Sequence, residues 1–223
     1  MGISITGASA PKHTKWDYGE CYAKVVLEKV FPERYSNLQI HDKPDLRDET
    51  NTIGIEVTSA IPQHTRESIS LWSRIESNAS KNPKRDIARM EQLGVKFTGG
   101  VQGWPSTVYP TGCFDKSPYV EIVSAIHGKI KKLNGGEYVS LKRYDLYVET
   151  ELFIETDFLL EILNRVLNIN TMEKSYSYLY ILCVNGICVF DLVEKTCEIR
   201  TIPFEQYDLA MEARNLVERA ETK

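Results

Sequence analysis

The sequence predicts a single α/β domain over residues 1–223, with a mixed central β-sheet flanked by helices. Apolar and polar residues alternate over 52–59, which is the period of a strand. Over 17–31, apolar residues recur at helical spacing, and Pro32 ends that pattern. Short apolar runs separated by turn residues over 178–202 indicate an antiparallel meander. Helical and strand periods therefore both occur along the chain, as an α/β fold requires.

The remaining elements follow from the same two periods. Turn residues before the strand predict a hairpin over about 44–59. Four glycines and two prolines predict a loop over 97–112, and we expect residues 97–140 to form an inserted or elaborated region. Further helices are expected at 66–78, 84–93, 119–133, 153–167 and 204–220, and further strands at 37–41, 144–150, 178–184, 187–192 and 198–202.

Composition excludes several classes of protein. The longest apolar stretch, Tyr178–Val184, is far too short to cross a bilayer, so we expect no membrane-spanning segment. No N-terminal stretch combines a basic start with an apolar block, so we expect no secretory signal and a cytoplasmic location. The 5 cysteines show no CxxC and no Cys/His ligand spacing, which argues against a disulfide framework and a structural zinc site.

Two cysteines are predicted to lie close together. Asn185-Gly186 is a favoured two-residue hairpin turn, and it would place Cys183 opposite Cys188 on the paired strands. In a reducing cytosol we expect two packed thiols, with a disulfide as the alternative.

Charge is distributed unevenly along the chain. Residues 64–96 carry a net charge of +3 and residues 116–143 a net charge of +4, whereas residues 144–223 carry −8. A basic middle is suited to a polyanion such as nucleic acid. Solvated helix faces are the alternative, and charge alone favours that alternative because the total is −4.

The most informative stretch is Pro44-Asp45, followed by ten residues and then Glu56-Val57-Thr58. The strand period places Glu56 and Thr58 on one face and the neighbouring apolar residues on the other. Asp45, on the preceding arm of the hairpin, can reach the same face. Two convergent carboxylates suit a hard divalent cation, because such cations take oxygen ligands. The alternative is structural, with Asp45 in a turn and Glu56 paired with Arg47 or with a helix lysine.

This arrangement resembles the active-site hairpin of the restriction-endonuclease-like nucleases, the PD-(D/E)xK superfamily. The resemblance covers roughly residues 17–60 and implies a restriction-endonuclease-like core. It implies that Asp45, Glu56 and the Val57 carbonyl hold Mg²⁺ or Mn²⁺. It also implies that Glu20, in the preceding helix, assists the metal site.

One position departs from the family pattern, because Thr58 stands where the family carries a lysine. That lysine helps to position or deprotonate the attacking water, and a threonine cannot supply its charge. Some members are thought to recruit a lysine from the following helix. Lys81 and Lys84 are the residues we expect in that role.

The resemblance implies a metal-dependent nuclease that hydrolyses phosphodiester bonds of DNA or RNA. A catalytically inactive member that binds nucleic acid, or one that serves as a protein-interaction module, remains the alternative. A homodimer is also open, because superfamily nucleases that cut both strands are often dimers. The basic side chains that we expect to contact the nucleic-acid backbone are Arg74, Lys81, Lys84, Arg85, Lys129, Lys131 and Lys132.

Overall fold

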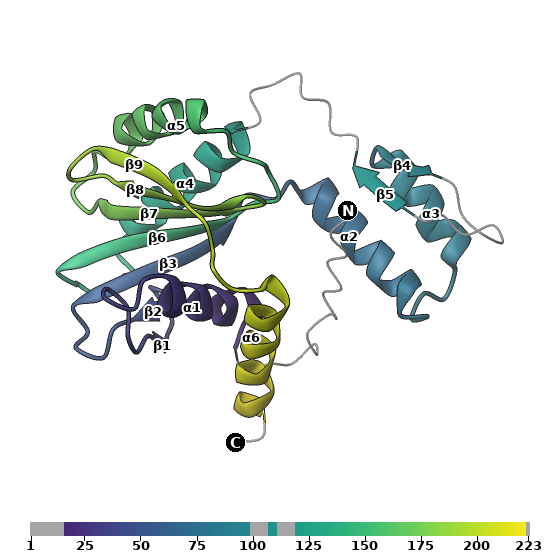
Figure 1. Cartoon of the computed structure of the whole chain (residues 1–223), viewed down its shortest axis with the longest axis horizontal. Coiled ribbons are helices and arrows are strands. Elements are labelled where there is room, and N and C mark those ends of the chain that lie inside the picture. The colour runs from purple at the N-terminus through teal and green to yellow at the C-terminus, as the bar shows by residue number, and fades with distance from the viewer. Residues whose placement is uncertain (1–15, 99–106, 111–118, 222–223) are drawn as a thin grey trace. The chain divides into compact units, whose positions relative to one another are not determined.

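A computed structural model of the protein describes residues 16–98, 107–110 and 119–221 (Figure 1). These residues form two compact units. The larger unit comprises the described residues before Ile61 and those from Tyr119 onward, and the smaller unit comprises the described residues between them.

The larger unit is built on a seven-stranded sheet with the order β1-β2-β3-β6-β7-β8-β9. The three central strands β3, β6 and β7 are parallel, and the remaining neighbours are antiparallel, so the sheet is mixed as predicted. The strands are β1 (Gln39–Ile40), β2 (Leu46–Arg47), β3 (Ile53–Ser59), β6 (Arg143–Glu149), β7 (Tyr176–Cys183), β8 (Gly186–Asp191) and β9 (Thr196–Arg200).

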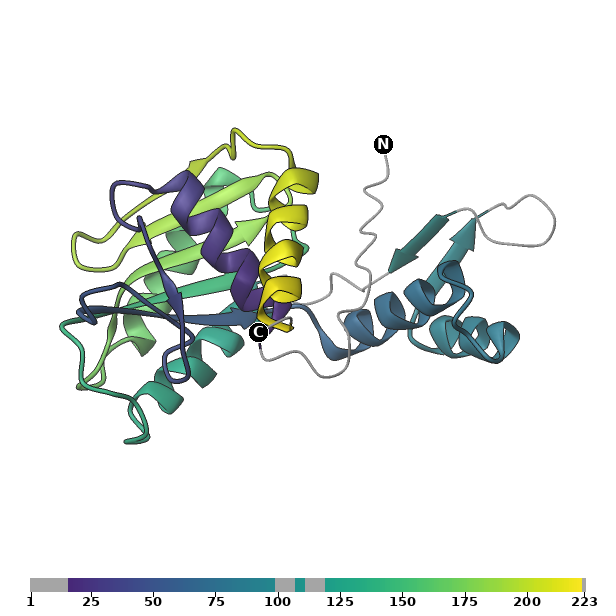
Figure 2. The same cartoon turned by 90° about the horizontal axis from the view of Figure 1, so that it is seen from below.

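Helices cover both faces of this sheet. On one face lie α1 (Tyr18–Val30) and α6 (Gln206–Glu221), side by side in Figure 2, and their apolar residues pack against Tyr147 and Tyr180. On the other face, α4 (Val120–Leu133) and α5 (Thr156–Ile169) pack against Leu146 and Leu179. Parallel central strands buried on both sides explain why β6 and β7 are almost continuously buried.

The smaller unit has its own small core. It contains α2 (Gln63–Glu76), α3 (Pro83–Gln92), β4 (Val95–Thr98) and β5 (Thr107–Pro110). Leu71 and Ile75 of α2 pack against Met90 of α3 and Val95 of β4. Burying these four side chains lets two short helices and a hairpin form a compact body.

Two expectations about the middle of the chain differ from the structure. Of the loop expected over 97–112, the structure describes residues 97–98 and 107–110, and the rest lies outside the described residues. The described part belongs to an antiparallel pair, β4 with β5, because β-favouring residues flank the glycine-rich segment. The elaborated region expected at 97–140 begins earlier, at Ile61, and ends before α4. Helix α4 belongs to the larger unit, because Ile122 and Ile126 are buried in its core.

The boundaries of the expected helices agree with the structure to within three residues. The register expected for the hairpin between β7 and β8 was wrong. Cys183 pairs with Gly186, so the two-residue turn is Val184-Asn185 and not Asn185-Gly186. The Asn185 side chain is engaged elsewhere: it accepts from the Ile154 backbone N–H at 3.1 Å and donates to the Ile154 carbonyl at 2.8 Å.

The corrected register still brings the two thiols together. The Sγ atoms of Cys183 and Cys188 lie 3.7 Å apart on neighbouring strands, and both cysteines are free and buried. None of the described helices combines the length and the apolar character needed to cross a bilayer.

Candidate active site

Asp45 is placed by the hairpin that joins β2 to β3. Leu46 of β2 pairs with Ile55 of β3, which sets Asp45 beside the continuing β3 strand. Its Oδ2 accepts a hydrogen bond from the Val57 backbone N–H at 2.7 Å. Pro44 packs directly on Gly54, where an added Cβ would lie 2.3 Å from Pro44 Cγ. The missing side chain at Gly54 therefore allows the close approach that fixes Asp45.

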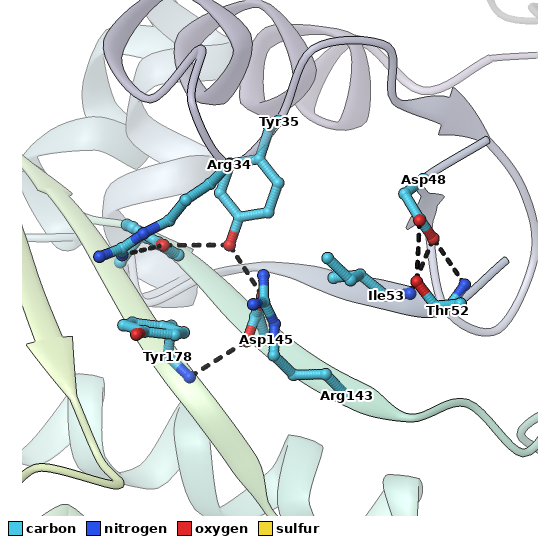
Figure 3. Close-up of polar contacts among 9 residues, drawn as sticks. Arg34, Tyr35, Asp48, Thr52, Ile53, Arg143, Asp145 and Tyr178 are labelled. Atoms are coloured by element: carbon cyan, nitrogen blue, oxygen red, sulfur yellow. Dashed lines mark hydrogen bonds and ion pairs between the residues drawn. The ribbon is translucent and has the colours of Figure 1, made fainter. Parts of the chain in front are cut away.

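The turn of this hairpin is held by Asp48. Its carboxylate accepts from the backbone N–H groups of Thr52 and Ile53, each at 2.7 Å, as Figure 3 shows. These hydrogen bonds satisfy the N–H groups at the start of β3. Burial raises the pKa of Asp48, but the Thr50 hydroxyl and these two N–H groups outweigh it and hold the pKa below its ordinary value. The turn therefore sets the register in which Asp45 meets β3.

Glu56 points away from the core that Ile55 enters, as the strand period predicts. Ile55 is fully buried on the α1 side of the sheet, and Ile53 and Val57 pack against the same cluster. Glu56 lies opposite Leu146 of β6, whose side chain belongs to the α4 side. A carboxylate only 5% exposed needs a partner or a cation in this position.

That partner is Lys129 from α4. Its Nζ lies 2.5 Å from Glu56 Oε1 and 3.8 Å from Asp45 Oδ2. These two oxygens are therefore no farther apart than the sum of the two distances. That limit is about 1 Å beyond the widest span between two oxygen ligands of one Ca²⁺, and about 2 Å beyond that of one Mg²⁺. The helix-lysine ion pair named above as the alternative role for Glu56 is thus present, at the place where the carboxylates converge.

Glu20 joins this group from the first turn of α1. The Asp17 side chain caps the helix and accepts from the N–H groups of Gly19 and Glu20. The pKa of Glu20 is raised to about 7 by burial first and then by the charge of Asp45. Burial and the charge of Glu56 likewise raise the pKa of Asp45 to about 6, although the Val57 N–H and Lys129 oppose the shift. The site therefore holds more negative charge than one lysine compensates.

One oxygen of Glu56, Oε2, is buried and has no hydrogen bond of normal geometry among the described residues. The Tyr138 side chain lies close enough to the Glu56 carboxylate to interact with it. Two buried tyrosines, Tyr138 and Tyr176, line the same region, and burial and the charge of Glu56 raise the pKa of both. An unsatisfied buried carboxylate oxygen costs free energy, so it marks a place for a donor or a cation.

The Val57 carbonyl points toward the side of β3 on which Asp45 lies. The N–H and C=O of one strand residue point in the same lateral direction, and the Val57 N–H points to Asp45. The pairing of β2 with β3 has ended at Ile55, so this carbonyl lies beyond the last paired residue. It can serve with Asp45 and Glu56 as an oxygen ligand.

The residues expected to supply the missing lysine lie in the other unit. Lys81 precedes α3 and Lys84 is in its first turn, and both are exposed in the smaller unit. Thr58 is half-buried opposite Val148. The sequence contained a signal for Lys129, because it falls on the apolar stripe of α4 at helical spacing from Ile126 and Leu133. We had expected only a phosphate contact from that residue.

The other residues expected to contact nucleic acid are divided between the units. Lys131 and Lys132 are exposed at the end of α4, one turn from Lys129. Arg74 pairs with Asp86 at 3.4 Å, whereas Arg85 is exposed. Lys131, Lys132 and Arg85 are therefore accessible, and Arg74 is partly neutralised.

A buried polar network on the opposite face of the sheet was missed by sequence reasoning (Figure 3). Asp145, fully buried beside Ile55, accepts from the Tyr35 hydroxyl at 2.8 Å and from Arg143 Nε at 3.0 Å. The Tyr178 backbone N–H donates to its other oxygen at 3.1 Å. Burial raises the pKa of Asp145 to about 6, and Arg143 opposes that shift. With its charge paired and both oxygens bonded, this carboxylate is structural.

Within the described residues, no group of three or more histidine, cysteine or acidic side chains is arranged to hold a metal ion. The site instead offers two close carboxylates, a third from Glu20 and a backbone carbonyl. Comparison of the chain with protein-family models, with curated proteins and with solved structures finds no match.

Proposed function

We propose that the protein is a metal-dependent nuclease that hydrolyses phosphodiester bonds, with its active site at Asp45, Glu56 and Lys129. One observation carries the proposal: two convergent carboxylates and a lysine meet beside a parallel strand, within ion-pair distance. The exposed Lys131 and Lys132 on the same helix are suited to a polyanionic substrate.

The residues at the site fit a hard divalent cation such as Mg²⁺ or Mn²⁺. Asp45, Glu56 and the Val57 carbonyl offer oxygen ligands, which these ions prefer. Burial first, and then the negative charge of neighbouring carboxylates, raise the pKa values of Glu20 and Asp45, so added positive charge would be favourable here. A bound divalent cation would supply that charge, activate water and polarise the scissile phosphate.

The protein's own side chains would have separate roles in binding the cation and the substrate. Asp45 and Glu56 hold the site at the edge of β3, and Glu20 adds a third carboxylate from α1. Lys129 supplies the positive charge that Thr58 cannot. Helix α4 brings this lysine from outside the hairpin, so it would take the role of the family lysine from a different position along the chain.

A second candidate function rests on the same ion pair. Lys129 already neutralises Glu56 in a nearly buried setting, with 15% and 5% of the two side chains exposed. Such a pair can hold a fold together without any metal. On this interpretation the protein would be an inactive nuclease-like module that binds nucleic acid or protein.

Titration of Mn²⁺ into the wild type and into Glu56→Gln, with a nuclease assay on single-stranded and duplex DNA and RNA, separates the two functions. We expect the wild type to bind Mn²⁺ and to cleave at least one substrate. We expect Glu56→Gln to lose at least about tenfold in affinity, because a charged ligand becomes neutral. Glu173→Gln, an exposed glutamate in the same unit, is the matched control. If Glu56→Gln binds Mn²⁺ as tightly as the wild type, or if the wild type binds no Mn²⁺, the nuclease function is excluded.

A further inference from the structure

The lysine of the candidate site lies where a cation would lie. Its Nζ is within reach of Glu56 Oε1 and Asp45 Oδ2 at once, at 2.5 Å and 3.8 Å. The Val57 N–H and the Lys129 ammonium are the donors that Asp45 Oδ2 faces. The ammonium thus occupies the space between the two carboxylates.

An ammonium and a divalent cation cannot share that space. Ligand oxygens lie about 2.0–2.6 Å from a bound Mg²⁺ or Ca²⁺-sized ion. Lys129 Nζ lies 2.5 Å from Glu56 Oε1, so an ion bound to that oxygen from the side of Asp45 would overlap the ammonium. Two positive centres at such a separation also repel strongly in a site with little solvent. A cation that bridges Glu56 Oε1 and Asp45 Oδ2 therefore requires the lysine to leave.

We propose that Lys129 is a built-in competitor of the metal, holding the carboxylates together in the metal-free protein and leaving when the cation binds. This inference rests on the proposed metal site and adds a second role for its lysine. The competition sets the metal affinity of the protein. The displaced ammonium then becomes available to the substrate phosphate.

The local structure gives Lys129 room to move. Its four-carbon side chain is flexible and carries its charge at the tip. It is 15% exposed, more than Glu56, so part of the side chain already reaches solvent. The preceding residue is an exposed Gly128, where an added Cβ would meet nothing within 4 Å. No side chain at that neighbouring position therefore covers this part of α4.

The test compares Mn²⁺ affinity in four proteins by titration calorimetry: wild type, Lys129→Met, Lys129→Arg and Lys142→Met. Methionine keeps most of the length of the side chain and removes its charge. We expect the dissociation constant of Lys129→Met to fall about tenfold or more, because no charged hydrogen bond must be broken for the metal to enter. Lys129→Arg keeps the competing charge and should not gain affinity. Lys142→Met, at an exposed lysine, should match the wild type.

Thermal unfolding supplies a second readout that does not depend on activity. Without metal, Lys129→Met should unfold at a lower temperature than the wild type, because Glu56 loses its partner. Saturating Mn²⁺ should raise its midpoint by more than it raises that of the wild type. An unchanged or weaker Mn²⁺ affinity in Lys129→Met overturns the inference, even if the wild type proves to be a nuclease. Tighter binding without cleavage in any variant upholds it and rejects the nuclease function.

Discussion

Glu20 and Asp45 show how burial and like charge act on single residues. Each carboxyl is partly removed from water and faces other carboxylates, so its folded pKa lies above its ordinary value. The folded protein therefore holds these protons more tightly than the unfolded chain does. Their contribution to stability is present below the ordinary pKa and is lost as the pH rises through the folded pKa.

The pH dependence gives a prediction for Glu20. In metal-free protein, its contribution should disappear as the pH rises from about 4.5 to about 7. Glu20→Gln removes this titration, so its stability should fall less between pH 5 and pH 8 than that of the wild type. We expect a difference on the order of 1 kcal/mol, allowing for partial exposure to solvent. Urea unfolding at both pH values measures it, and parallel curves for the two proteins would contradict it.

The β2–β3 hairpin and helix α4 act together at the level of the element. The hairpin sets Asp45 and Glu56 by register, Asp48 secures its turn, and Pro44 rests on Gly54. Helix α4, which follows the smaller unit along the chain, then adds Lys129. The site forms because α4 packs against β3, which is one arm of the hairpin.

Gly54→Ala tests the hairpin. The new Cβ would lie 2.3 Å from Pro44 Cγ and 2.5 Å from Leu141 Cδ1, so at least one neighbour must shift. We expect a loss of about 1–3 kcal/mol in unfolding free energy, as for other overpacked sites. Because Pro44 directly precedes Asp45, Mn²⁺ affinity should fall as well.

A glycine on α4 provides the control for that substitution. At Gly128 an added Cβ meets nothing within 4 Å, and the residue is exposed within a helix. Gly128→Ala should therefore stabilise the protein by about 0.5–1 kcal/mol. Chemical denaturation measures both variants. Similar effects of the two alanines would show that packing against Pro44 does not set the hairpin.

The described residues of the molecule form two units with separate hydrophobic cores. No described residue of the smaller unit contributes to either buried cluster of the larger one. Asp45, Glu56, Glu20 and Lys129 all lie in the larger unit, whereas Lys84 and Arg85 belong to the smaller one. If the proposed nuclease function is correct, the exposed Lys84 and Arg85 of the smaller unit would add contacts to the nucleic-acid backbone.

Replacing residues 61–118 with a flexible glycine-serine linker tests this division. Because its core clusters are complete without the smaller unit, the shortened protein should fold and still bind Mn²⁺. Its nucleic-acid affinity should fall, and the slope of log affinity against log salt should become shallower, because fewer phosphates are contacted. Fluorescence anisotropy at several salt concentrations measures the slope. An unchanged slope would assign the contacts to the larger unit alone.

Most of the helices and strands, and the nearness of Asp45 to Glu56, could be predicted from local patterns in the sequence. Period-two alternation placed Ile55 and Glu56 on opposite faces, and short-range spacing placed Asp45 on the neighbouring arm, because these relations depend only on local geometry. The tertiary structure alone decided which lysine meets them. Lys129 is 73 residues from Glu56 along the chain, and no local period links such positions. The turn at Val184-Asn185 and the buried partners of Asp145 were decided in the same way, by contacts made only after the chain had packed.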